Sequence, residues 1–255
     1  FMKKGIVWFR NNFRLADNES LTRALDECDE VLCVYFLEPR TWNSIAEPSR
    51  MGSIRAKFIL ESLLELEGDI QELGGTMEFI QGRAVDEIPR ILQSYGADRC
   101  YAQKEDAWWE TEQEHLLADQ INLILSGGRG IWEESDLPFA LNDLPAVFSS
   151  FRRKVEKKMQ IRSLFPPPRS MACSWETKTE LPTLTSLGFE EYSTDERAVL
   201  DFRGGAKWAK KWMNQWIWER DCLKEYKETR NGMVGADYSC KLSPWLSIGC
   251  ISAVE

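Results

Sequence analysis

The stretch "KGIVWFRNNFRLADNESLTRALDECDEVLCVYFLE", residues 4–38, has the pattern of one strand–helix–strand unit. It begins with an apolar run bounded by charge, short enough for a buried strand, and it ends with a second run rich in β-forming side chains. Between the two runs, residues 18–29 have helical spacing, and either Asn18 or Ser20 is placed to cap the first turn. Two buried strands joined by a helix indicate a parallel sheet.

The same alternation of strand and helix continues to about residue 130. Strands are expected at residues 4–10, 30–38, 76–82 and 98–104, and helices at residues 18–29, 53–74, 84–96 and 108–127. The pattern predicts an α/β fold, a five-stranded and mostly parallel Rossmann-like sheet with helices on both faces. No GxGxxG follows the first strand, so the dinucleotide-binding fingerprint is missing, and the GGRG at 127–130 is expected to be the turn that ends a helix.

The composition changes after the α/β region, which we place at residues 1–132. Residues 133–200 are rich in proline and polar side chains, which predicts an irregular connector with one helix at 146–160. Residues 201–255 are helical and aromatic in pattern, with one long helix expected over 204–232. One long helix and the start of another cannot bury their own apolar faces, so we expect this part to be the truncated start of a helical domain.

Composition excludes several classes of protein. No run of eighteen apolar residues is present, which excludes a transmembrane helix, and no signal peptide is seen. The seven cysteines are odd in number and form no CxxC, so free thiols in the cytoplasm or another reducing intracellular compartment are expected, with no disulfide framework and no metal site. The single histidine, His115, is expected on the surface, which argues against histidine-ligated metals and serine–histidine triads.

Charge is divided unevenly along the chain. Residues 1–150 hold 14 basic and 27 acidic side chains, a net charge of −13, whereas residues 151–255 hold 18 and 14, a net charge of +4. An anionic partner is therefore expected to bind the second half.

The stretch "DYSCKLSPWL", residues 237–246, places hydroxyls and a lysine directly before a helix start. Ser243 before Pro244 is typical of a helix cap followed by proline in the first turn. The unpaired N–H groups of that turn, the hydroxyls of Ser239 and Ser243, and the charge of Lys241 would meet in one small volume, which suits a phosphate or diphosphate. A plain capped helix with a surface lysine is the alternative.

The longer stretch "YKETRNGMVGADYSCKLSPWLSIGCIS", residues 226–252, resembles the flavin-binding segment of the photolyase–cryptochrome family, most closely that of DASH-type cryptochromes. Three other stretches resemble the same family in order along the chain: "VWFRNNFRLADNESL" at 7–21, "DLPFALNDLPAVFSSFRRKVE" at 136–156 and "FRGGAKWAKKWMNQWIWERDCLKEY" at 202–226. The resemblance therefore covers nearly the whole chain. It implies an antenna domain, a connector, and the beginning of an FAD-binding domain that continues beyond Glu255.

By this resemblance, six residues take positions that contact FAD, chiefly its diphosphate: Tyr226, Ser239, Cys240, Lys241, Leu242 and Ser243. Cys240 stands where other members carry serine or threonine, which weakens a side-chain hydrogen bond but leaves the backbone donors. Arg230 takes a position that family members use against DNA, and the catalytic residues are expected beyond residue 255.

The resemblance also implies a possible antenna chromophore, 5,10-methenyltetrahydrofolate, with Glu105 in "AQKEDAWWE" as the matching acidic residue. Ser150 replaces a glutamine that is usual in relatives, and Trp108 and Trp109 are bulky where relatives have small polar residues. An occluded or altered antenna pocket is the alternative.

Three functions are compatible with these patterns. The first is light-driven repair of cyclobutane pyrimidine dimers, mainly in single-stranded DNA, by an electron from photoexcited reduced FAD. The second is blue-light signalling by the same kind of flavoprotein without repair, and the third is a nucleotide-binding α/β module unrelated to light.

The tryptophans of the second half lead to an expectation about the chain by itself. Trp208, Trp212 and Trp216 are spaced along one helix face, as in core packing, and with Trp218 and Trp245 they are expected to face helices that the chain does not contain. We therefore expect the 255-residue chain to be colourless and inactive alone, and either to self-associate through its second half or to leave that half poorly ordered.

Overall fold

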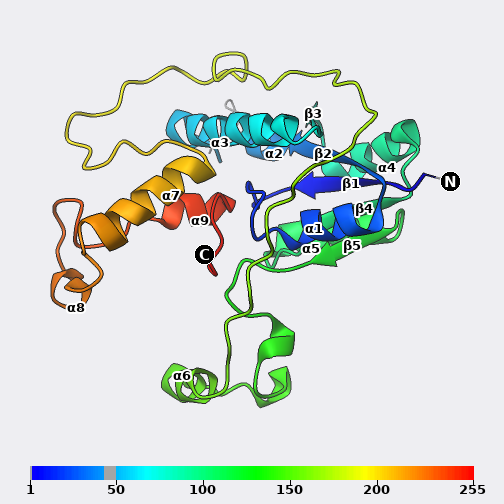
Figure 1. Ribbon diagram of the computed structural model, residues 1–255. Coiled ribbons are helices and arrows are strands. Elements are labelled where there is room, and N and C mark those ends of the chain that lie inside the picture. The colour runs from blue at the N-terminus through cyan, green and yellow to red at the C-terminus, as the bar shows by residue number, and fades with distance from the viewer. Residues whose placement is uncertain (1, 43–49) are drawn as a thin grey trace.

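A five-stranded parallel sheet forms the centre of the protein in the computed structural model, which describes residues 2–42 and 50–255 (Figure 1). Its strand order is β3-β2-β1-β4-β5, and every neighbouring pair is parallel. The strands are β1 (Lys4–Phe9), β2 (Glu30–Leu37), β3 (Thr76–Gln81), β4 (Arg99–Gln103) and β5 (Leu123–Ser126). The predicted α/β sheet is confirmed.

Helices cover both faces of the sheet, as the sequence pattern predicts. On one face, Val7 and Phe9 of β1 share a core with α1 (Glu19–Glu27) and α3 (Ser53–Glu72). On the other face, Ile6 and Trp8 share a second core with α4 (Ala84–Tyr95) and α5 (Trp108–Ala118). A short helix, α2 (Pro39–Trp42), follows β2. Successive side chains of β1 thus point alternately into two apolar layers, one on each face of the sheet.

The first helix begins as the sequence indicates, and the fifth strand lies where a helix was expected. Asn18 is the N-cap of α1, and its side chain accepts a hydrogen bond from the backbone N–H of Leu21. The helix expected over 108–127 ends instead at Ala118, and Leu123–Ser126 forms β5. The reason is pairing along β4, because this apolar run satisfies its backbone by extending the sheet. The glycine-rich turn at 127–130 therefore follows a strand, and its assignment to a helix end is wrong.

The connector is irregular and carries an arm that extends from the body of the molecule (Figure 1). This arm, which we call the α6 arm (residues 133–160), contains η1 (Glu134–Asp136), η2 (Leu141–Asp143) and α6 (Phe148–Glu156). Beyond it the connector returns along β3, where the buried carboxylate of Glu78 accepts hydrogen bonds from the indole of Trp175 (2.9 Å) and the hydroxyl of Thr179 (3.0 Å).

The long helix expected over 204–232 is broken. The structure has α7 (Ala206–Asn214), a π-helical turn η3 (Gln215–Glu219), and only a short α8 (Tyr226–Thr229) before α9 (Ser243–Ile248). The break follows from Asp221, whose φ of 51° is left-handed and cannot continue a right-handed helix.

Residues 201–255, which we call the helical segment, pack into the same hydrophobic core as α3. The expectation that the tryptophans of this segment face absent helices is therefore wrong for most of them. Trp212, Trp216 and Trp245 are buried in the hydrophobic core between the sheet and helices α1 and α3. Trp218, by contrast, is 76% exposed. The N-terminus of α7 rests on side chains of α3: Gly204 N donates to Glu61 (2.8 Å), Gly205 N to Ser62 (2.9 Å) and Lys207 N to Glu65 (2.9 Å).

Other observations concern the thiols, the histidine and the membrane. All seven cysteines are free thiols, and His115 is exposed on α5. None of the helices that the structure describes combines the length and the apolarity needed to span a membrane.

The backbone of Gly249 lies directly against the loop that follows β1, which makes this position sensitive to a side chain. Its φ is 70°, and a Cβ here would overlap the carbonyl oxygen of Asn11. We expect Gly249→Ala to lower the free energy of unfolding by about 2 kcal/mol or more, since a left-handed Cβ alone costs about 1–2 kcal/mol. Urea unfolding measures the change. The control is Gly68→Ala inside α3, where no atom meets the added Cβ and about 0.5–1 kcal/mol should be gained.

Candidate functional site

The carboxyl ends of β1 and β4 mark the point where the strand order reverses. β1 lies between β2 and β4, so the crossovers that leave β1 and β4 go to opposite sides of the sheet. Open α/β sheets bind ligands in the crevice at such a point. The loops that line it follow β1 at residues 10–12 and β4 at residues 104–107.

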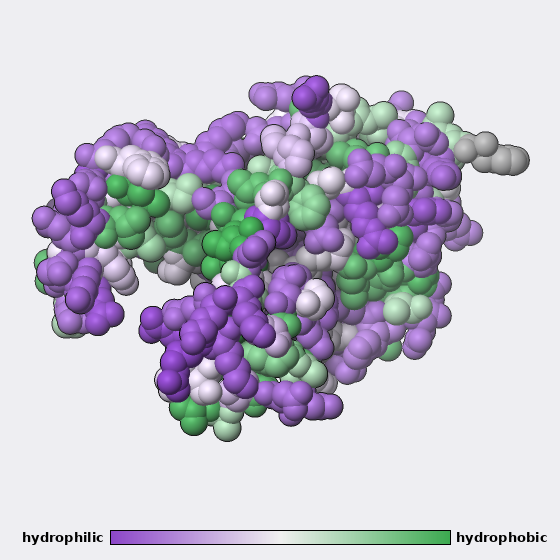
Figure 2. Space-filling model, turned by 60° about the horizontal axis from the view of Figure 1, so that its bottom comes forward, coloured by the Kyte–Doolittle hydropathy of each residue, from purple (hydrophilic) through white to green (hydrophobic). Residues whose placement is uncertain are grey.

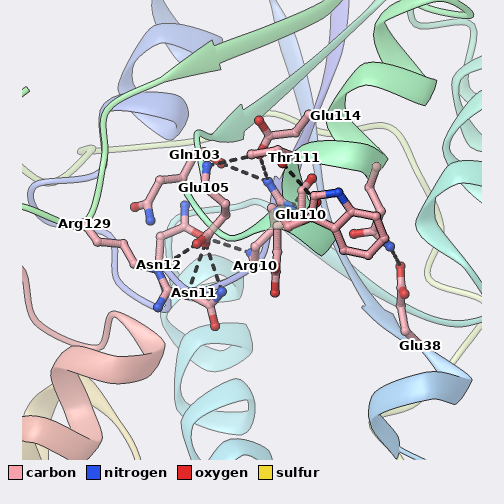
Figure 3. Close-up of polar contacts among 12 residues, drawn as sticks. Arg10, Asn11, Asn12, Glu38, Gln103, Glu105, Glu110, Thr111, Glu114 and Arg129 are labelled. Carbon is pink, nitrogen blue, oxygen red and sulfur yellow. Dashed lines mark hydrogen bonds and ion pairs between the residues drawn. The ribbon is translucent and has the colours of Figure 1, made fainter. Parts of the chain in front are cut away.

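A buried ion pair fills this crevice (Figure 3). The guanidinium of Arg10 forms a salt bridge with Glu114 of α5 and donates to the carbonyl oxygens of Gln103 (3.3 Å) and Glu110 (3.2 Å). The guanidinium also lies over the ring of Trp8, with Cζ of Arg10 4.3 Å from the ring centroid. Because all these groups satisfy one another, the crevice side of β1 is a closed polar network rather than an open binding surface.

Glu105 is buried at the edge of the same network, and protein groups already occupy both of its carboxylate oxygens. One oxygen accepts from the side-chain amide of Asn11 (2.9 Å), and the other lies 2.8 Å from Arg129 Nε. Arg129 comes from the glycine-rich turn after β5, so that turn serves to hold Glu105 (Figure 3). In this arrangement Arg129 lies directly on the carboxylate of Glu105 and competes with a pterin for it.

A small pocket lies beside this cluster, between the sheet and the end of the chain. Its volume is about 150 Å³, and Asn11, Gln103, Arg129 and Gly249 contribute to its wall. Ligand pockets for drug-sized molecules measure about 300–1,000 Å³, so the pocket does not fit a folate as it stands. Nε2 of Gln103 and Oγ of Ser126, neighbours in the β4–β5 register, are buried without a hydrogen-bond partner in the described residues, as is typical of groups that bind water.

Asp17 joins three distant segments at the same edge. Its carboxylate accepts from Arg162 Nη2 (3.0 Å) and from the backbone N–H of Phe165 (3.2 Å), both in the connector. Burial by itself would raise the pKa of Asp17, but the hydrogen bonds from Arg162, Ser252 and the Phe165 backbone outweigh it, so the pKa lies below its ordinary value. Asp17 thereby stabilises the contact of the connector and the C-terminal segment with the sheet.

The segment predicted to bind a diphosphate is anchored by two tryptophans. The indole N–H of Trp212 donates to the carbonyl oxygen of Cys240 (2.6 Å), and that of Trp216 donates to the carbonyl oxygen of Asp237 (3.1 Å). The ring of Tyr226 packs edge-on against Trp216, with centroids 6.0 Å apart. Together, α7 through Trp212 and the π-helical turn through Trp216 hold residues 237–240 and Tyr226.

Lys241 has the features expected of an anion-binding lysine. Its φ is 51°, a left-handed conformation that is uncommon for a residue with a side chain and that often marks functional turns. Its Nζ lies 3.4 Å from the hydroxyl of Ser239 and 3.6 Å from the ring centroid of Tyr238, and it forms no salt bridge with any described residue. A hydroxyl and an uncompensated, half-buried ammonium therefore share one small volume, which fits a phosphate group.

The other predicted site residues are placed differently. Ser243 is the first residue of α9 rather than its cap; Leu242 is the N-cap, and no side chain caps the helix. The left-handed turn at Lys241 explains the shift, because it lets the right-handed backbone begin at Leu242. Leu242 is buried in the core, so only its backbone could contact a ligand, and Arg230 is exposed at the end of α8 with no side-chain bond to the described residues. No three His, Cys, Asp or Glu side chains in the described ranges are grouped to hold a metal ion.

Comparison with known proteins agrees with this architecture. A family model described as DNA photolyase matches residues 5–171. A cryptochrome DASH from Synechocystis sp. is 36% identical over 254 residues, which are 97% of this chain and 52% of that protein. The crystal structure of Synechocystis sp. PCC6803 cryptochrome matches with a TM-score of 0.90 at 35% identity, over 99% of this chain and 54% of the other.

A more distant structure shares the fold alone. An archaeal photolyase from Sulfolobus tokodaii, crystallised with two FAD molecules, matches with a TM-score of 0.71 at 22% identity, over 98% of this chain and 53% of the other. The chain thus spans about half the length of the relatives it matches.

Substitution of Asp17 by Asn is expected to destabilise the protein most near neutral pH. Since the native pKa lies below the ordinary value of 3.8, the ionised carboxylate contributes stability above about pH 4, and this is lost as the pH falls through the lower native pKa. Urea unfolding from about pH 7 to pH 3 should show the difference from the parent narrowing below about pH 4. The exposed Asp119→Asn serves as a control, and a difference that stays constant over this range would contradict the assignment.

Proposed function

The chain belongs to the DNA photolyase family, and we propose that it serves in a light-dependent flavoprotein that repairs cyclobutane pyrimidine dimers, mainly in single-stranded DNA. The observation that carries the proposal is the turn at Lys241, where an ammonium without a carboxylate partner and a hydroxyl are held by backbone anchored on two indoles. The similarity to cryptochrome DASH proteins over nearly the whole chain supports it.

FAD is the cofactor of this proposal, and when bound in its reduced form it would supply the excited electron that opens the dimer. Lys241 and Ser239 would hold the diphosphate by charge and hydroxyl, and the backbone of Cys240 and Leu242 would add polar contacts. Tyr226, which is 40% exposed and packed on Trp216, would close the site from the side of α8. The photolyase crystallised with two FAD molecules has the same fold, which supports the choice of cofactor.

DNA is the proposed partner, and the second half of the chain is the proposed contact. This half has a net charge of +4, and Arg230 is exposed with its charge free for a phosphate. A dimer must leave the base stack to reach a flavin, which is easier in a single strand. We further propose the division into an antenna domain (1–132), a connector (133–200) and the start of an FAD-binding domain (201–255), in a reducing compartment that keeps the cysteines as thiols.

Self-association of the chain by itself also stays a proposal. The exposure of Trp218, Tyr226, Met233 and Val234 supports it, because all four are large apolar side chains of residues 218–234 that water contacts.

Lys241→Glu is expected to reduce flavin retention at least tenfold, because repulsion of the diphosphate replaces a charged contact of about 1.5–3 kcal/mol. The measurement is the flavin absorbance of the protein with its complete natural sequence after extensive dialysis, followed by light-dependent repair of a dimer in a single-stranded oligonucleotide. Lys227→Glu, exposed on α8, is the matched control. Full flavin occupancy in Lys241→Glu would reject the phosphate site, and flavin photoreduction without repair in the parent would replace repair by blue-light signalling.

A methenyltetrahydrofolate antenna at Glu105 is a separate proposal, with Arg129 displaced when the pterin binds. Glu105→Gln should then lower folate retention, since the carboxylate accepts from pterin N–H groups more strongly than an amide does. Reconstitution with excess folate, read from the near-ultraviolet band, measures this, with the exposed Glu112→Gln as control. The absence of a new band in the parent protein would reject the antenna and leave the flavin proposal intact.

A further inference from the structure

The α6 arm contains a hollow of about 500 Å³ whose charged wall is entirely basic. Pro138 and Phe139 form one side, and α6 with the turn after it forms the other. The polar side chains that line it are Ser150, Arg153, Lys154, Lys157 and Lys158.

The positive charge of this hollow is not neutralised within the arm. Arg152 of α6 pairs with Glu156, but the four lining cations form no salt bridge with any residue that the structure describes. The acidic residues of η1 do not line the hollow: Glu133 and Asp136 instead bind each other's backbone N–H groups. All four lining cations are exposed, so the charge is available to a ligand.

Aromatic rings lead from the hollow to the surface. Phe148 is 73% exposed and stacks on Phe151, with centroids 6.1 Å apart and planes 27° from parallel. Phe151 meets Phe139 edge-on at 5.9 Å, and Lys154 Nζ lies 5.4 Å from the centroid of Phe139. In Figure 2 the α6 arm is the lobe at the bottom of the view, where hydrophilic and apolar residues lie side by side. Phe148 is thus connected to the basic hollow through Phe151 and Phe139, and its exposed ring is available for stacking.

We propose that the α6 arm binds a single strand of nucleic acid, with phosphates in the basic hollow and a base stacked on Phe148. Single-strand sites combine a positively charged groove with aromatic side chains that stack on bases, and both lie here on α6 and the turn that follows it. A duplex would keep its bases stacked and leave Phe148 unused. The arm lies apart from α8 in Figure 1, and Arg230 is the residue that ends α8, so this surface adds a second contact to the one proposed there. It needs neither flavin nor light.

The test is dark binding of a fluorescein-labelled oligothymidylate of about 16 nucleotides, followed by anisotropy between about 50 and 200 mM salt. Lys154→Gln/Lys157→Gln/Lys158→Gln should weaken binding roughly tenfold or more at the lowest salt. It should also reduce the slope of log affinity against log salt by about 2, because each phosphate contact contributes about 0.7.

A control removes three exposed cations outside the arm, one just before β1 and two at α4: Lys3→Gln/Arg83→Gln/Arg90→Gln should bind like the parent. Phe148→Ala should weaken binding about fivefold or more without changing the salt slope, since it removes stacking and no charge. Circular dichroism confirms that each variant keeps its helices.

Equal binding by the parent and the triple lysine variant overturns the proposal. So does a second pattern, in which the triple variant loses binding to phosphatidylserine vesicles but keeps the oligonucleotide, which would assign the arm to a membrane surface. Loss of flavin or of repair activity in the Lys241 experiment leaves this result unaffected, so the two proposals fail independently.

Discussion

The close approach of Gly249 to the loop after β1 is the contact on which both candidate sites depend. The backbone N–H of Phe13 donates to the carbonyl oxygen of Ile248 (3.2 Å), and Arg14 Nη1 donates to that of Gly249 (3.1 Å). Only a glycine lets these two backbones meet, because any side chain at position 249 would overlap Asn11. Through this contact, the end of the helical segment is fixed against the carboxyl edge of the sheet. Gly204 acts in the same way at the other end of the segment, against the carbonyl oxygen of Phe58.

The architecture of the α/β part was accessible from periodicity, because each strand and helix there buries a continuous apolar run. Each wrong prediction has an identifiable physical cause. Residues 123–126 continue a helical pattern directly, and only their pairing with β4, a contact between segments, makes them a strand. The helix over 204–232 fails at one left-handed residue, Asp221, which no pattern of apolar residues reports. The burial of Trp245 depends on α3 and on the carbonyl oxygen of Arg203, to which its indole donates (2.8 Å).

The candidate site was predictable where a short motif carries it and not where distant residues complete it. Ser239 and Lys241 stand two residues apart, so the sequence placed them together, and the structure does the same. The spacing of Trp212 and Trp216 identified a shared face, but not that their indoles would hold the backbone of residues 237–240. Arg129 lies far along the chain from Glu105, and nothing in the sequence indicates that it occupies that carboxylate. The buried pair of Arg10 and Glu114 was missed for the same reason.

The contact between Asn11 and Gly249 also has a consequence for the order of folding. It joins residues near the two ends of the chain, so its formation closes a loop of almost the whole molecule. The parallel pairs of the sheet join strands that are much nearer in sequence. We therefore expect the sheet and its helices to assemble before the helical segment docks, because so long a loop is costly to close. Interactions made that late govern how slowly the native state opens rather than how quickly it forms. On that order of events, the Gly249 contact holds the helical segment closed against the sheet without affecting how fast the sheet itself forms.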